Sequence, residues 1–167
     1  LFVITLPVTA YSQSNKFTIQ DIKFESQNII LSGSIIYPKY PFAAVVIVHG
    51  SDPVKREMEF AKRLAKEGIA VLTYDKRGVG ESGGVYVGPS VGTNNIDSTN
   101  LNLLSNDADE AVKAFRTYLK DKKTPIGLVG FSQAGWIIPI TASKNPQIDF
   151  MVLFSCPTIT TLEQLRF

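Results

Sequence analysis

The sequence predicts an α/β fold in which a mainly parallel β-sheet is flanked by helices. Three short runs, residues 43–48, 69–74 and 126–129, consist mainly of apolar side chains that do not alternate with polar ones. Such runs are typical of strands that are buried on both faces of a sheet. Segments with helical periodicity separate the runs, and this alternation favours parallel strands joined by right-handed crossovers.

The chain begins with Leu1 rather than methionine, and its first segment is apolar. Leu1–Leu6, followed by a proline and several small residues, is typical of the end of a secretory signal peptide. We therefore expect residues 1–12 to be a signal-peptide remnant and residues 13–167 to form a single domain. The protein would then be exported, to the periplasm or into the medium. An ordinary first strand is the alternative for this segment.

A hairpin and then a helix are expected in the next part of the chain. Residues 16–37 alternate in a strand-like way on either side of a turn at residues 27–28. After the first apolar run, Asp52 can cap a helix, and Pro53 suits the first helical position. Apolar residues then recur at helical spacing, and we expect this helix to end at Gly68.

The second half of the chain contains the clearest helical pattern. Residues 84–102 are rich in glycine, serine, threonine and asparagine, and we expect them to form a variable surface loop. Residues 106–120 follow as a helix with acidic residues near its start and lysines near its end. A helix at 136–143, a strand at 150–154 and the start of a helix at 163–167 complete the chain. The apolar face of the longest helix is formed by Ala108, Ala111, Val112, Phe115 and Leu119.

The composition argues against several classes of function. The chain is 44% hydrophobic and 19% charged, with a net charge of +2 and scattered lysine and arginine residues, so no nucleic-acid partner is expected. One cysteine, Cys156, and one histidine, His49, cannot form a disulfide or a zinc site, and we expect neither a metal nor a cofactor. Cys156 is expected to be buried and inert. No segment approaches the ~20 apolar residues of a membrane span, and the oligomeric state is not indicated.

A serine between small residues follows the third apolar run. Gly130-Phe131-Ser132-Gln133-Ala134 connects a buried strand to a helix, which is the pattern of a nucleophile elbow. Gly130 and Ala134 are small, as needed where the end of the strand and the first helical turn nearly touch. The backbone N–H of Gln133 can then face an oxyanion. Ser132 is therefore the candidate nucleophile of a serine hydrolase, and a serine that only caps a buried helix is the alternative.

Three motifs in order, each after an apolar run, resemble those of the α/β-hydrolase superfamily. They lie at residues 49–51, 75–82 and 130–136. Within the superfamily, the set is similar to exported bacterial hydrolases of the dienelactone-hydrolase-like, serine-aminopeptidase-like and acyl-thioester-hydrolase-like groups. The resemblance covers residues 17–167, which would be strands one to six of an eight-strand sheet. It implies a partial α/β-hydrolase domain that lacks the last strands of the fold.

The resemblance also implies roles for individual residues. Ser132 would be the nucleophile, and the backbone N–H groups of Gln133 and Ser51 would form the oxyanion hole, in a loop supported by His49 and Gly50. Such donors contribute about 3–4 kcal/mol each in comparable sites. The partner would be a small-molecule or peptide acyl substrate, cleaved at an ester, thioester or amide bond. The elbow departs from the family by an alanine at its last small position and by a phenylalanine where histidine is frequent.

The sequence contains only part of a catalytic triad. In this fold the chain order is serine, then a carboxylate, then histidine, yet no histidine follows Ser132. The later carboxylates, Asp149 and Glu163, are not where the acid of the family would be. We expect the acid and the histidine to lie beyond Phe167, so that the chain is a fragment and inactive alone. His49 acting as the base is the alternative.

Two other interpretations of the chain remain possible. The chain could be a non-catalytic binding protein of the same fold, or an inactive truncated chain. A third, remote alternative is a nucleotide-binding domain, because Gly78, Gly80 and Gly83 match a dinucleotide-binding motif. Charged residues separate that motif from its strand, and no helix is expected directly after it. We instead expect Asp75 and Arg77 to join neighbouring loops.

Overall fold

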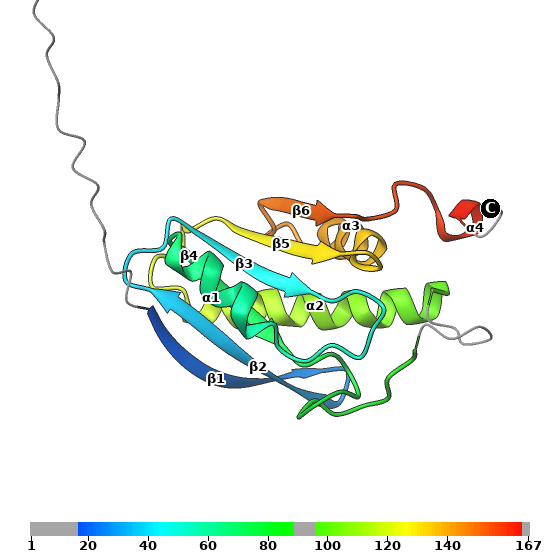
Figure 1. Ribbon diagram of the computed structural model, residues 1–167, viewed down its shortest axis with the longest axis horizontal. Coiled ribbons are helices and arrows are strands. Elements are labelled where there is room, and N and C mark those ends of the chain that lie inside the picture. The colour runs from blue at the N-terminus through cyan, green and yellow to red at the C-terminus, as the bar shows by residue number, and fades with distance from the viewer. Residues whose placement is uncertain (1–16, 89–95, 165–167) are drawn as a thin grey trace, which may run out of the picture.

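The computed structural model describes residues 17–88 and 96–164 (Figure 1). Within this part, six strands form one mixed sheet in the order β1-β2-β4-β3-β5-β6. The strands β3 to β6 are parallel, whereas β2 runs antiparallel to both of its neighbours. The predicted α/β fold is therefore confirmed. The strands are β1 (Phe17–Ser26), β2 (Ile29–Pro38), β3 (Ala43–Val48), β4 (Ile69–Tyr74), β5 (Ile126–Phe131) and β6 (Phe150–Phe154).

Helices cover both faces of the sheet. Apolar residues of α1 pack with those of β3 and β4 on one face, whereas α2 and α3 cover the other face (Figure 1). The apolar face predicted for the longest helix is fully buried, with Phe115 at its centre. The helices are α1 (Met58–Lys66), α2 (Ser98–Tyr118), α3 (Ala134–Lys144) and α4 (Thr161–Gln164).

The predicted hairpin is present, with its turn at Gln27 and Asn28. Both residues have positive backbone φ angles, 48° and 62°, as in the two-residue turns that match the twist of a hairpin. The expected signal-peptide remnant, residues 1–12, lies outside the described residues, and so do residues 89–95 of the predicted loop.

The start of α1 was predicted wrongly. The chain stays irregular after Asp52 because tertiary hydrogen bonds occupy backbone donors that a helix would leave to its own cap. The N–H of Arg56 donates to Oδ1 of Asp75 at 2.9 Å, and the N–H of Glu57 donates to Oγ1 of Thr73 at 2.9 Å. The segment before α1 is therefore fixed to the end of β4.

The start of α2 was also predicted wrongly, since the helix begins at Ser98 rather than at residue 106. Asp97 caps it by accepting the N–H of Asn100 at 2.7 Å. Leucines in its first two turns are buried and extend the core. The surface loop predicted at 84–102 is correspondingly shorter.

The last strand has an exposed apolar surface. In the part of the chain that the structure describes, β6 pairs with β5 and lies at the end of the sheet. Its side chains Met151, Val152, Leu153 and Phe154 are 48%, 38%, 41% and 43% exposed. The strand expected at residues 150–154 is confirmed, and it forms an exposed apolar edge. A helix that could span a lipid bilayer is not found in the described part of the chain.

Candidate functional site

The carboxyl ends of β3, β4 and β5 meet at one edge of the sheet (Figure 1). Val48, the last residue of β3, is paired with Gly130 near the end of β5. The loop that begins at His49 therefore lies beside the loop that contains Ser132. The sheet order brings together the first and third sequence motifs, and β4 places the second motif on the other side of β3.

Ser132 lies on a sharp turn between β5 and α3. Its backbone φ is 53°, in the left-handed region that residues other than glycine seldom adopt. A Cβ atom on Gly130 would lie 2.4 Å from Cβ of Ala134 and 2.7 Å from the carbonyl oxygen of Val48. Only glycine fits there, and this close approach turns the chain from strand to helix and leaves Ser132 exposed.

An open hollow gives access to the serine. It has a volume of about 400 Å³ and is lined by Ser132, Gln133, Trp136, Ser155, Cys156 and Pro157. Cys156 is half-buried, so its expected full burial is wrong. Partial burial raises the pKa of its thiol, which donates to the carbonyl oxygen of Phe154 at 3.3 Å. The thiol is therefore protonated near neutral pH.

The loop after β3 contacts the serine turn directly. A Cβ atom on Gly50 would lie 3.6 Å from Cβ of Ser132 and 3.4 Å from the carbonyl oxygen of Phe131. Ser51, the next residue, is half-buried, and Gln133 is almost completely buried. The structure thus brings together the candidate nucleophile and the two residues whose N–H groups were predicted to face an oxyanion.

Lys76, which the sequence analysis did not single out, connects these residues. Its Nζ donates to the carbonyl oxygen of Gly50 at 2.6 Å, to that of Ser51 at 3.2 Å and to Oε1 of Gln133 at 3.1 Å. The side chain is only 2% exposed. A lysine two residues after a buried strand is the one sequence signal for this arrangement, and it becomes informative only once β4 is known to lie beside β3.

Tyr86 adds a second contact to the same loop. Its hydroxyl donates to the carbonyl oxygen of Ser51 at 2.8 Å, and the Nζ of Lys76 lies 5.4 Å from the centre of its ring. Gly78, with φ 71°, permits this packing, because a Cβ atom there would lie 2.2 Å from the backbone nitrogen of Tyr86. The segment after β4 thereby folds over the Ser51 loop.

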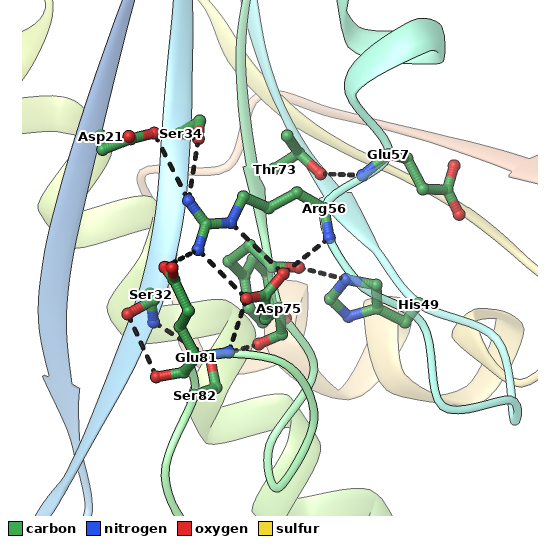
Figure 2. Close-up of polar contacts among 11 residues, drawn as sticks. Asp21, Ser32, Ser34, His49, Arg56, Glu57, Thr73, Asp75, Glu81 and Ser82 are labelled. Carbon is green, nitrogen blue, oxygen red and sulfur yellow. Dashed lines mark hydrogen bonds and ion pairs between the residues drawn. The ribbon is translucent and has the colours of Figure 1, made fainter.

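His49 is turned towards β4 rather than towards the serine. Its Nε2 lies 2.6 Å from the carbonyl oxygen of Tyr74 (Figure 2), so this nitrogen carries the proton and donates it. Burial, and then the charge of Lys76, lower the pKa of His49 to about 4. No hydrogen bond joins His49 to Ser132 in the described part of the chain. The alternative in which His49 is the base therefore gains no support from the geometry.

Asp75 joins three segments beneath the site, as predicted (Figure 2). Its carboxylate accepts the Nη2 of Arg56 at 3.1 Å and the N–H of Glu81 at 2.9 Å. Burial alone would raise the pKa of Asp75, but these bonds outweigh it and hold the pKa below its usual range. The carboxylate is therefore ionised at neutral pH and fixes the loop after β4.

Arg77 joins a second set of segments, also as predicted. Its Nε donates to Oδ2 of Asp107 on α2 at 2.9 Å, and its Nη2 pairs with the other carboxylate oxygen. The same carboxylate accepts the hydroxyl of Ser26 at 2.6 Å. All three side chains are buried, so this ion pair connects β1, the loop after β4 and α2.

The structure does not favour the remote nucleotide-binding alternative. The glycines of the weak dinucleotide motif lie in the irregular loop after β4, and the next helix begins only at Ser98. Among the described residues, no three histidine, cysteine, aspartate or glutamate side chains are grouped to hold a metal ion.

A profile described as serine aminopeptidase, S33, matches residues 39–165. No curated protein sequence matches the chain significantly. Among solved structures, the chain is similar to the α/β hydrolase GrgF from a Penicillium species, with 21% identity over 83% of this chain and 46% of that chain and a TM-score of 0.67. It is similar to the esterase Pf2001 of Pyrococcus furiosus, with 27% identity over 84% of this chain and 53% of that chain and a TM-score of 0.64.

The chain is also similar to dienelactone hydrolase from Anabaena variabilis, with 18% identity over 84% of this chain and 64% of that chain and a TM-score of 0.65. It spans about half the length of the first two solved structures. These likenesses show that the fold expected from the three motifs is right.

Proposed function

Because this chain belongs to the serine aminopeptidase S33 family of α/β hydrolases, we propose that it contains the nucleophile of a serine hydrolase. Ser132 would form an acyl-enzyme with a small-molecule or peptide substrate that has an ester, thioester or amide bond. The match to an esterase at 27% identity supports acyl transfer without selecting among these bonds.

The conformation of Ser132 is the observation that supports this proposal most strongly. A left-handed conformation costs about 1–2 kcal/mol for a residue with a Cβ atom, and such strain is concentrated at functional sites. A serine that only capped a helix would not need it. The cap residue of α3 is Gln133 rather than Ser132, and the Gln133 side chain makes no capping hydrogen bond. The strained backbone instead leaves the Ser132 side chain exposed, at the mouth of the hollow.

The proposed reaction begins with transfer of the Ser132 hydroxyl proton to a base as Oγ attacks the acyl carbon. The N–H groups of Gln133 and Ser51 would stabilise the oxyanion of the tetrahedral intermediate, and the leaving group would depart with a proton. Water would then hydrolyse the acyl-enzyme and restore the hydroxyl. Donors placed in this way are worth about 3–4 kcal/mol each in the transition state.

The base and its orienting carboxylate would be supplied by a part of the protein that follows Phe167. Two facts support this proposal. The chain spans about half of the solved hydrolases that it resembles, and in this fold the acid and the histidine follow the nucleophile in the sequence. His49 is occupied by the Tyr74 carbonyl and is a weak base, because its pKa is about 4.

Labelling with a fluorophosphonate probe tests the proposal, because the probe reacts with an activated serine and does not report on binding alone. The full-length wild-type protein should be labelled and should hydrolyse a p-nitrophenyl ester. Ser132→Ala should lose both properties. Ser143→Ala is the matched control, since Ser143 is an exposed serine of α3, the helix that follows Ser132, and its hydroxyl donates to the Ile140 carbonyl.

Two outcomes would contradict the proposal. A full-length protein that remains unlabelled at saturating probe would favour a non-catalytic binding protein of the same fold. Labelling and turnover that persist in Ser132→Ala would mean that another residue is the nucleophile, and mass spectrometry of the labelled peptide would identify it.

A further inference from the structure

Lys76 is a buried cation in contact with both segments that border the candidate nucleophile. Its three short contacts reach two carbonyl oxygens of the loop after β3 and the side-chain oxygen of Gln133 on the serine turn. Its own backbone N–H also donates to the carbonyl oxygen of Val54 at 3.0 Å. A single residue at the end of β4 thus holds the loop of β3 and the turn of β5 together.

The burial of this ammonium group needs an explanation. Removing a charge from water costs several kcal/mol unless the charge is paired or well hydrogen-bonded. Among the described residues, no carboxylate lies within ion-pairing distance of Lys76. Burial lowers the pKa of Lys76 to about 8, and the negative charge of Asp52 opposes this shift. The group is therefore mainly protonated at pH 7 and needs all three of its acceptors.

The geometry of the peptide unit shows what these contacts control. The carbonyl of Gly50 and the N–H of Ser51 belong to one planar, trans peptide and point in opposite directions. A cation 2.6 Å from the Gly50 oxygen fixes the plane and thereby the direction of the Ser51 N–H. It also polarises the peptide, which strengthens the N–H as a donor. The contact with Oε1 of Gln133 holds the residue that bears the other donor.

We propose that Lys76 is a positioning residue that aligns and polarises the two backbone donors, Ser51 and Gln133, of the oxyanion hole. This inference rests on the proposed function of Ser132. Lys76 acts through the peptide of Ser51 and the side chain of Gln133, from behind the loop. It therefore affects the charge that develops in the transition state and leaves binding of the uncharged substrate unchanged.

Tyr86 provides a weaker version of the same effect. Its hydroxyl bond to the Ser51 carbonyl restrains the neighbouring peptide of the same loop. Loss of this one neutral hydrogen bond should loosen the loop less than loss of the three donated by the Lys76 ammonium group.

The test compares Lys76→Met, Tyr86→Phe and Lys62→Met in the full-length protein. Methionine keeps much of the volume of lysine without its donors or its charge. Lys62 is a control because its only described ion pair is with Glu59, an exposed residue of the same helix, α1. Rates are divided by the concentration of active sites, which is measured by letting a fluorophosphonate react to completion. Misfolded protein then does not contribute to the rates.

We expect Lys76→Met to lower kcat and kcat/KM together by about 100-fold, as expected for the loss of an oxyanion donor, with KM changed less than about threefold. Tyr86→Phe should lower both by about threefold, and Lys62→Met should leave them unchanged. Affinity for a boronic acid, whose adduct with the serine is tetrahedral and anionic, should fall in parallel with kcat/KM.

Each other outcome overturns a defined part of the proposal. If Lys76→Met has a lower melting temperature but retains the wild-type kcat for each labelled serine, the lysine is structural and the inference is wrong. The same holds if the variant changes only the KM. The proposed function would then still stand. If the wild-type protein shows no turnover that depends on Ser132, both proposals are wrong. If Lys76→Met fails to fold, a wild-type kcat and boronic acid affinity in Tyr86→Phe would contradict the inference.

Discussion

His49 donates its Nε2 proton to the carbonyl oxygen of Tyr74 at 2.6 Å, and its ring packs edge-on against the Tyr74 ring at 4.6 Å. The side chain is only 3% exposed. A protonated imidazole would therefore lose its hydration without gaining a carboxylate partner. In this position the only histidine of the chain stabilises the end of β4 and is kept neutral.

The first prediction concerns stability in acid. The pKa of His49 is about 4 in the folded protein, against 6.5 in the unfolded chain. Between these values the unfolded chain binds the additional proton, so stability decreases as the pH falls from 6.5 to 4 and is unaffected by His49 above 6.5. The loss amounts to about 2.5 kcal/mol at pH 4.5. Urea unfolding at pH 7 and pH 4.5 measures it.

His49→Gln is the comparison for this experiment, because glutamine can donate to the Tyr74 carbonyl but does not titrate. The variant should lose less stability than the wild-type protein between pH 7 and pH 4.5. Equal losses in the two proteins would contradict the assignment to His49.

The second prediction concerns the ion pair between Arg77 and Asp107. Arg77→Met leaves a buried carboxylate without its cation and should destabilise the protein by about 3–5 kcal/mol. Adding Asp107→Leu removes the stranded charge and should restore part of that loss, since buried ion pairs are often replaced by apolar groups at little cost. Chemical denaturation of the two variants measures the difference. A double variant less stable than Arg77→Met would contradict this account.

The third prediction concerns the close approach at Gly130. Gly130→Ala places a methyl group 2.4 Å from Cβ of Ala134. We expect a loss of about 1–3 kcal/mol in stability from overpacking, together with a displaced Ser132 that reacts slowly with a fluorophosphonate. Gly83→Ala is the matched control, because the nearest atom to a new methyl group there would lie at an ordinary 3.4 Å. The prediction fails if both variants behave alike.

The fourth prediction concerns the apolar edge at β6. Residues 17–167 expressed alone should self-associate, because an exposed apolar edge strand can pair with another chain. Met151→Lys should reduce this association, since Met151 is the most exposed side chain of β6, at 48%, and a lysine on an edge disfavours pairing. Light scattering over a concentration series measures it. If residues 17–167 without the substitution remain monomeric, the exposed edge of β6 does not cause self-association.

Most of the sheet could be predicted because its signals are local. The run Ala43–Val48 contains no polar residue, and the turn at Gln27 and Asn28 separates two alternating segments. The start of α1 could not be predicted, because it depends on acceptors from a distant strand. Asp75 and Thr73 take the backbone donors of the segment that the sequence assigns to a helix.

The candidate site divides in the same way. Ser132 and Gln133 were identified because the elbow pattern lies within five consecutive residues. Lys76 was not singled out, because its contacts require β4, β3 and β5 to lie side by side. The local periodicity of a sequence does not determine the order of strands in a sheet. The sequence left a role as base open as the alternative for His49 for a related reason, since only the fold shows that its ring faces Tyr74.

The pairing of β3 with β5 also determines when the site is assembled as the chain folds. The hairpin of β1 and β2 closes a short loop, whereas the pairing of Ala44 with Ile126 closes a long loop that contains α1, β4 and α2. Contacts between residues that are distant in the sequence cost more loop-closure entropy, and they are therefore expected to form later. We therefore expect Gly50 and Ser132 to come together late in folding. In a refolding experiment, reactivity of the serine should follow the collapse of the chain rather than accompany it.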